Sequence, residues 1–247
     1  MSLARLSDVE VIYAGRGAAL GPFDLSIEPR EAVALVGPSG CGKSTALRLL
    51  AGLEAPTRGM ADLRVRKGET SVVFQSPTLA PWLSTQANVA LPLILAGVVR
   101  SEARARAEAA LERVGLDAAR SARPAQLSGG MAMRAALARA LVTQPRLLLL
   151  DEPFAALDEI TRRRLADDLL SIWAETGAAM VFVTHNVEEA AYVAGRVVVM
   201  TPGPGRFAGE IRVEASSPRP EGFRLTPAFR AAVETTSHKL SVAMTAA

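Results

Sequence analysis

This chain of 247 residues contains very little cysteine and lysine. Cys41 is the single cysteine, so an intrachain disulfide and a cysteine-based zinc site are both excluded. Lysine occurs only at Lys43, Lys67 and Lys239, and arginine supplies the rest of the 28 basic side chains. With 25 acidic side chains the formal charge is +3, which is too balanced to indicate a nucleic-acid partner by itself.

The sequence also lacks an apolar run long enough to cross a bilayer. A spanning helix needs about 20 apolar residues, whereas Pro92 and Gly97 interrupt the longest nearly apolar stretch, residues 89–99. Residues 1–10 contain no long apolar run, so a secretory signal is not expected. Mean hydropathy is nevertheless +0.21. This value favours either a large buried core or docking onto an apolar partner.

Short apolar runs alternate with longer amphipathic segments, which is typical of an α/β protein with a largely parallel sheet. Strands are expected at residues 32–36, 71–74, 147–150, 180–183 and 196–200, and helices at 44–50, 101–114 and 227–240. The region between Gln75 and Pro145 contains helical stretches and no convincing strand, which indicates a helical subdomain inserted into the core. Residues 201–206 and 216–222 are expected to be turn and linker because they are rich in proline and glycine.

Residues 37–45, GPSGCGKST, match the full phosphate-loop pattern between an expected strand and an expected helix. The glycines let backbone N–H groups approach phosphate oxygens, and the helix N-terminus attracts the same anion. Lys43 adds a charge for the β- and γ-phosphates, and the Ser44 hydroxyl is a ligand for Mg²⁺. A glycine-rich turn that binds nothing is the alternative, and the complete pattern in this context favours a nucleotide site.

Asp151 and Glu152 follow directly on four leucines at residues 147–150. A buried strand that ends in carboxylates places them at the sheet edge where open α/β proteins bind ligands. We expect Asp151 to hold hydrated Mg²⁺ and Glu152 to accept a proton from the attacking water. By themselves the two acids equally suit an acidic helix start; together with Lys43 they favour catalysis.

Between these two motifs lies the sequence LSGGM at residues 127–131, and this order resembles ATP-binding-cassette (ABC) ATPases over residues 6–213. The resemblance implies a parallel-sheet ATPase core, an antiparallel β subdomain and the inserted helical subdomain. It also implies one domain over residues 1–213, with the helical subdomain at approximately 76–145, and a C-terminal extension at 214–247 that contains the last helix. Residues 57–70 are shorter than is typical of the family, which suggests a trimmed β-hairpin.

The resemblance assigns roles residue by residue. Catalysis would fall to Glu152, His185, Gln75 and Lys43, and Mg²⁺ to Ser44, Gln75 and Asp151. ATP would contact Tyr13, Gly37, Pro38, Ser39, Gly40, Cys41, Gly42, Lys43, Ser44, Thr45, Ser128, Gly129, Gly130 and Asp158. In this assignment Tyr13 stacks on adenine, Asp158 belongs to the D-loop (residues 155–158) and His185 is the switch histidine. The signature turn, Ser128 to Gly130, would close the site of a second copy.

A finer resemblance is to the nitrate, sulfonate and taurine uptake group, which also includes importers of thiamine-precursor pyrimidines. It is carried by residues 80–83 (APWL), 156–162 (ALDEITR) and 200–206. The group implies a peripheral ATPase on the cytoplasmic face of the cell membrane that forms an ATP-bound homodimer on integral-membrane permeases. A periplasmic or surface solute-binding protein would act indirectly, and no nucleic acid would be bound.

Trp82 lies in the apolar stretch 77–95, for which permease contact and core packing are equally plausible. Other functions also stay open. An exporter or lipoprotein-release ATPase is the main alternative, because residues 88–93 have some of that character. Nucleic-acid-directed cassettes carry coiled coils, zinc cysteines or tandem cassettes, none of which this sequence contains. An inactive regulatory cassette conflicts with the presence of both Glu152 and His185.

Overall fold

The computed structural model describes residues 1–15, 17–214 and 219–245. Its centre is a six-stranded sheet in the order β5-β6-β7-β3-β8-β9, in which β9 alone is antiparallel to its neighbour. The strands are β3 (Ala32–Val36), β5 (Thr70–Val73), β6 (Leu147–Asp151), β7 (Ala179–Thr184), β8 (Arg196–Met200) and β9 (Phe207–Arg212). The prediction of an α/β fold with a largely parallel sheet is confirmed.

Both faces of this sheet are covered, which explains the unbroken leucine run in β6. Leu148 and Leu150 pack into the core under the helices α4 (Gly129–Leu141), α5 (Glu159–Thr176) and α6 (Val187–Val193). Leu147 and Leu149 point to the opposite core, which is shared with helix α1 (Lys43–Leu50). A strand that is buried on both faces needs apolar residues at every position rather than at alternate ones.

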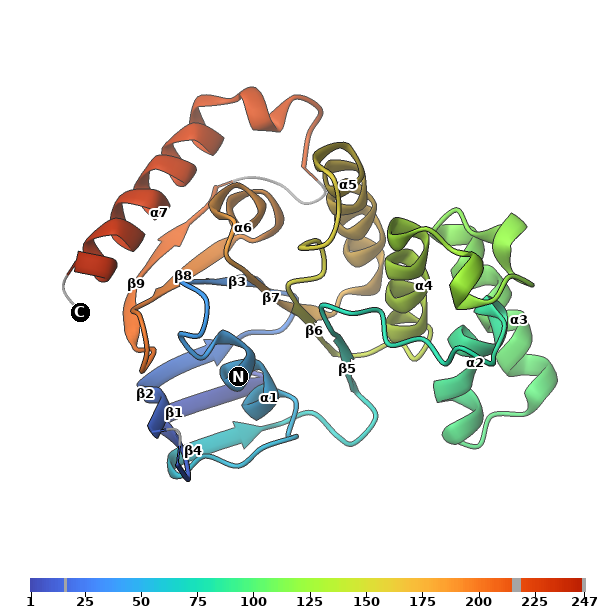
Figure 1. The fold of residues 1–247 in the computed structure, drawn as a ribbon, viewed down its shortest axis with the longest axis horizontal. Coiled ribbons are helices and arrows are strands. Elements are labelled where there is room, and N and C mark those ends of the chain that lie inside the picture. The colour runs from blue at the N-terminus through green and yellow to red at the C-terminus, as the bar shows by residue number, and fades with distance from the viewer. Residues whose placement is uncertain (16, 215–218, 246–247) are drawn as a thin grey trace.

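A second, three-stranded antiparallel sheet lies beside α1 in the order β2-β1-β4 (Figure 1). Its strands are β1 (Ala4–Tyr13), β2 (Gly17–Ile27) and β4 (Arg58–Leu63). The antiparallel β subdomain is therefore confirmed. The expectation of a trimmed hairpin within residues 57–70 is wrong, because β4 pairs with β1 and the next strand, β5, belongs to the other sheet.

The helices α2 (Thr85–Leu95), α3 (Arg100–Arg113) and α4 form a group at one side of the molecule (Figure 1). This group, with short 3-10 turns at Asp117–Ala119 and Pro124–Gln126, agrees with the helical insertion expected there. At the opposite side, α7 (Pro227–Thr245) packs along α6 and β9 after a 3-10 turn at Phe223–Leu225. The predicted linker partly falls at residues 216–218, which lie outside the described residues.

None of the helices in the described parts of the chain is long and apolar enough to span a membrane. The feature of the fold that matters most for function is one edge of the six-stranded sheet. The carboxyl ends of β3, β6 and β7 converge at one edge of the sheet, where ligands bind in open α/β proteins.

Candidate functional site

The phosphate loop connects β3 to α1 and is folded around its own lysine. The Lys43 side chain is only 5% exposed, and its Nζ donates hydrogen bonds to the carbonyl oxygens of Gly37 (2.8 Å) and Pro38 (2.9 Å). Gly42, the residue before α1, has φ of 99°, and a Cβ there would collide with the Ala19 carbonyl. Only glycine fits at this position. The glycine and the two lysine hydrogen bonds together hold the loop around a buried cation.

The two carboxylates at the end of β6 reach this loop. The Ser44 hydroxyl donates a hydrogen bond of 3.0 Å to Asp151 Oδ1, which joins the two halves of the site. Burial raises the pKa of the Asp151 carboxyl above its ordinary value, and the hydrogen bond from Ser44 opposes that rise. Glu152 Oε1 lies 3.9 Å from Lys43 Nζ.

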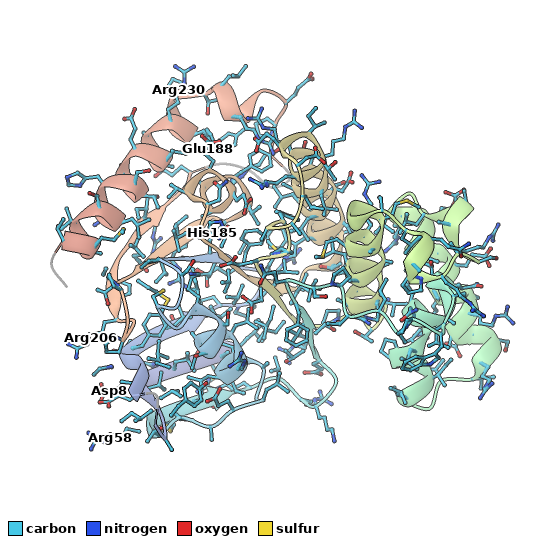
Figure 2. All side chains as sticks on the ribbon, viewed as in Figure 1. Asp8, Arg58, His185, Glu188, Arg206 and Arg230 are labelled. Carbon is cyan, nitrogen blue, oxygen red and sulfur yellow. The ribbon has the colours of Figure 1, made fainter. Side chains whose placement is uncertain are left out.

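Glu152 is held in a strained backbone conformation. Its φ is 44°, a left-handed value that costs a non-glycine residue on the order of 1–3 kcal/mol. Its N–H donates to the Val183 carbonyl at 2.9 Å, and its Oε2 lies 3.0 Å from Nδ1 of the exposed His185. In Figure 2 His185 lies near the centre of the view, away from Asp8 and Arg58 on the three-stranded sheet. The ends of β6 and β7 thus place an acid and a histidine side by side.

The phosphate loop and the two carboxylates border a polar cleft of about 360 Å³, whose lining does not include His185. It is lined by Ala19, Ser39, Gly40, Gly42, Lys43, Ser44, Thr45, Arg48, Gln75, Asp151 and Glu152. Arg48 was not predicted, although its place one helical turn after Ser44 was the available signal. Its charge lowers the pKa of Asp151, again opposing the effect of burial.

The donor set suits Mg²⁺ only in combination with a nucleotide. Ser44, Gln75 and Asp151 offer oxygen ligands of the kind that Mg²⁺ prefers, with a single carboxylate among them. Within the described residues, no group of three or more His, Cys, Asp or Glu side chains could hold a metal alone. Mg²⁺ usually takes one or two carboxylates together with substrate phosphates and water, so the residues present fit this ion.

The segment at residues 201–206 supports the phosphate loop from behind, a role that the sequence did not reveal. Gly205 lies so close to the Cys41 carbonyl that a Cβ on it would collide, and a Cβ on Gly37 would approach the Met200 backbone to 3.2 Å. The Cys41 thiol is itself buried, and burial raises its pKa. The expectation of a turn was correct, but only the tertiary structure shows that this turn packs against the phosphate loop.

Other predicted site residues lie outside this cleft. Ser128 caps α4, its Oγ accepting the Met131 N–H at 3.3 Å, and Ser128 and Gly129 are exposed. Asp158 caps α5 through the Thr161 N–H at 3.0 Å. The Tyr13 hydroxyl donates a hydrogen bond of 2.9 Å to Glu54 Oε2, and Tyr13 does not line the cleft.

A phosphate loop, a strand-end carboxylate pair and a neighbouring histidine on a parallel sheet define a nucleoside-triphosphate hydrolase of the P-loop class. Residues 20–155 match the family model described as ABC transporter. The chain belongs to the ABC transporter family, as an ATPase of that type.

Two curated relatives and one solved structure illustrate the match. The taurine import ATP-binding protein TauB of Sinorhizobium fredii is 40% identical over 247 residues, covering 93% of this chain and 92% of the relative. The bicarbonate transport ATP-binding protein CmpC of Synechococcus elongatus is 46% identical over 209 residues, 82% of this chain but 31% of that longer relative. The dimeric, post-hydrolysis structure of the ATP-binding cassette MJ0796, bound to ADP and Pi, aligns with a TM-score of 0.77 and 31% identity, covering 86% of this chain and all of that one.

Proposed function

We propose that this chain powers uptake of a small solute as the ATPase subunit of an ABC importer. The solute would be an anion of the nitrate, sulfonate or taurine kind, or a thiamine-precursor pyrimidine, and would pass through a separate permease. The nearly full-length similarity to a taurine import protein supports import. The contacts among Lys43, Glu152 and His185 support ATP hydrolysis as the driving reaction.

Each residue of the site has a task in this proposal. Backbone N–H groups of residues 37–45 cradle the phosphates, and Lys43 neutralises charge on the β- and γ-phosphates. Glu152 takes a proton from the attacking water, and His185, bonded to Glu152, holds the γ-phosphate and that water in line. Ser44, Asp151 and Gln75 would hold Mg²⁺, which stabilises charge on the phosphates when bound.

Two copies are needed to enclose ATP. The cleft of one chain is open, while the signature turn of the same chain is exposed at another place, at the N-terminus of α4. The N–H groups at the start of α4 suit a phosphate, so the signature turn of a partner copy would cover the γ-phosphate. In this arrangement Tyr13 stacks on adenine and Asp158 lies at the dimer seam. The dimeric relative MJ0796 supports the same assembly.

Trp82 belongs to the proposed permease contact. Its side chain is 73% exposed, which overturns the alternative that it packs in the core. The buried Asn88 fixes the segment around Trp82, donating to the carbonyls of Ala80 (3.1 Å), Leu83 (3.3 Å) and Ser84 (3.1 Å). A rigid segment that presents an exposed aromatic ring suits an apolar cytoplasmic helix of a permease.

The proposal places the chain on the cytoplasmic face of the cell membrane, held there by the permease. It divides the chain into one ATPase domain at residues 1–213, with a helical subdomain at approximately 76–145, and an extension at 214–247. A solute-binding protein would act through the permease, and no nucleic acid would be bound. The exporter alternative differs in needing no such binding protein.

The experiment that tests import is reconstitution. The chain is co-purified with its permease and placed in liposomes. Its ATPase rate is then measured with the solute-binding protein, empty or loaded with taurine, nitrate, bicarbonate or a pyrimidine. We expect the isolated chain to hydrolyse ATP slowly, because nothing holds two copies in register, and one loaded binding protein to raise the rate of the reconstituted complex. A high rate that no partner changes would contradict a transport role, and stimulation by solute without any binding protein would indicate export.

A further inference from the structure

A series of polar contacts connects the D-loop to His185 through side chains to which no function has been given. Arg162, on the first turn of α5, donates from Nη2 to the Leu157 carbonyl at 3.0 Å. Its Nε lies 3.3 Å from Glu189 Oε1 on α6. The arginine therefore contacts the D-loop backbone and the helix that follows His185 at the same time.

From Glu189 the contacts continue to the histidine segment. Glu189 Oε2 accepts a hydrogen bond of 2.6 Å from the Thr184 hydroxyl, and Thr184 Oγ1 in turn accepts the Asn186 N–H at 3.0 Å. These two contacts fix the backbone on both sides of His185. His185 itself meets Glu152 at 3.0 Å.

The contact between Arg162 and Glu189 is largely shielded from water. The Arg162 side chain is 24% exposed and that of Glu189 is 11% exposed. Burial raises the pKa of the Glu189 carboxyl, while the Thr184 hydrogen bond and the charge of Arg162 lower it. Removing one partner of such a pair leaves the other buried without its counter-charge, so the histidine segment would rearrange.

At the end away from His185, this series of contacts reaches the signature turn. Gly129 lies next to Leu157, to which a Cβ on the glycine would come within 3.8 Å, and a Cβ on Gly130 would meet the Thr161 methyl group at 2.9 Å. The start of α4 thus packs directly against the D-loop and the first turn of α5. Within one polypeptide, the signature turn and His185 are joined through packed groups, hydrogen bonds and the ion pair between Arg162 and Glu189, in which Arg162 Nε makes no hydrogen bond to any described residue.

We propose that Arg162 is a positioning residue that, through Glu189 and Thr184, holds His185 against Glu152 and links this geometry to the D-loop and the signature turn. The inference rests on the catalytic roles proposed for Glu152 and His185. In the head-to-tail dimer, the signature turn serves the partner's ATP while His185 serves the ATP of its own chain. Arg162 therefore couples the closure of one site to the alignment of water in the other.

The test compares Arg162→Gln with Arg163→Gln in the full-length chain. Arg163 is the matched control because it is the next residue on α5 and shares the partner Glu159, contacting it at 2.7 Å, while no contact joins it to Leu157 or Glu189 in the described structure. We expect Arg162→Gln to lower kcat about 10- to 100-fold, since misplacement of reacting groups has effects of this size. ATP affinity, measured with a fluorescent analogue, should not change because Arg162 does not line the cleft.

Two further variants separate positioning from folding. Arg162→Lys keeps the charge but cannot reach both partners, so its kcat should fall between those of the wild type and Arg162→Gln. The double variant Arg162→Gln with Glu189→Gln should be no slower than the slower single variant, because both act along one path.

Three results would overturn the proposal. The first is a kcat for Arg162→Gln equal to that of Arg163→Gln. The second is that Arg162→Gln and Arg162→Lys lose kcat, ATP affinity and thermal stability to the same extent. The third is a double variant whose loss of kcat is the product of the two single losses. Glu152→Gln, measured alongside, keeps the two proposals separate. Full hydrolysis by that variant would refute the catalytic assignment itself, whatever Arg162 does.

Discussion

Replacing Glu152 with Gln is expected to abolish ATP hydrolysis while ATP binding persists. The substitution removes the group proposed to accept the proton of water, a role that contributes about 10²- to 10⁴-fold to rate. It leaves Ser44 and Asp151, which are joined at 3.0 Å, and the Lys43 cradle in place. It also removes a negative charge that would repel the γ-phosphate, so the ATP-bound dimer should be longer-lived.

The measurement for Glu152→Gln is phosphate release together with gel filtration in ATP and Mg²⁺. Glu175→Gln is the control, because Glu175 is exposed and pairs with Arg113 away from the cleft. We expect the control to hydrolyse ATP normally and Glu152→Gln to elute as a dimer only with ATP. Normal turnover by Glu152→Gln would refute the role of the base. A variant that stays monomeric would mean either that the dimer model fails or that the permease is needed to hold the pair.

Replacing Lys43 with Ala is expected to reduce hydrolysis by on the order of 10²- to 10³-fold and to weaken ATP binding as well, because an electrostatic group at the phosphates is lost. Hydrogen bonds to charged groups contribute about 1.5–3 kcal/mol, which corresponds to about 10- to 100-fold in Kd. The variant also leaves the Gly37 and Pro38 carbonyls without their donor, so the loop loses its internal support.

Nucleotide titration and an ATPase assay check the Lys43→Ala variant. Lys67→Ala serves as its control, since Lys67 is an exposed lysine outside the cleft. The control should match the wild type in both assays, and a thermal melt should show Lys43→Ala to be folded. Near-normal turnover by folded Lys43→Ala would refute the assignment of the phosphate site.

Much of the central fold was predictable because local pattern and tertiary role agree there. The leucines of β6 are buried on both faces, so their unbroken run identifies a central parallel strand. β9 escaped prediction because it is an exposed edge strand with Gly209 at its centre, and it gains its structure by pairing with β8. β4 was misassigned because its partner, β1, lies far away in sequence.

The same distinction holds at the site. Lys43, Ser44 and Asp151 belong to motifs whose spacing specifies their chemistry, and the structure brings them together. Arg162 ends the segment 156–162 that carries the finer resemblance, but no motif assigns a chemical role to it or to Glu189, since an arginine and a glutamate on two helices are usually surface residues. Their contact depends on how α5 packs against α6, and only the tertiary structure fixes that packing.

The central claim, that each ATP site is built from two chains, is tested most directly by mixing two inactive variants, Lys43→Ala and Ser128→Arg. Lys43→Ala disables the cleft of its own chain, and Ser128→Arg blocks the exposed signature turn by bulk and charge. In a mixed dimer one site receives both damaged motifs and the other receives an intact Lys43 and an intact Ser128. Random pairing makes about half of the dimers mixed.

The measurement is the ATPase rate of the mixture at several ratios of the two variants, with subunit exchange shown independently by fluorescence energy transfer between labelled chains. A site shared between chains predicts that activity reappears on mixing, since every mixed dimer contains one intact site. If the signature turn instead served its own chain, each site of a mixed dimer would contain one damaged motif. No recovery at any ratio, despite demonstrated exchange, would contradict the shared site.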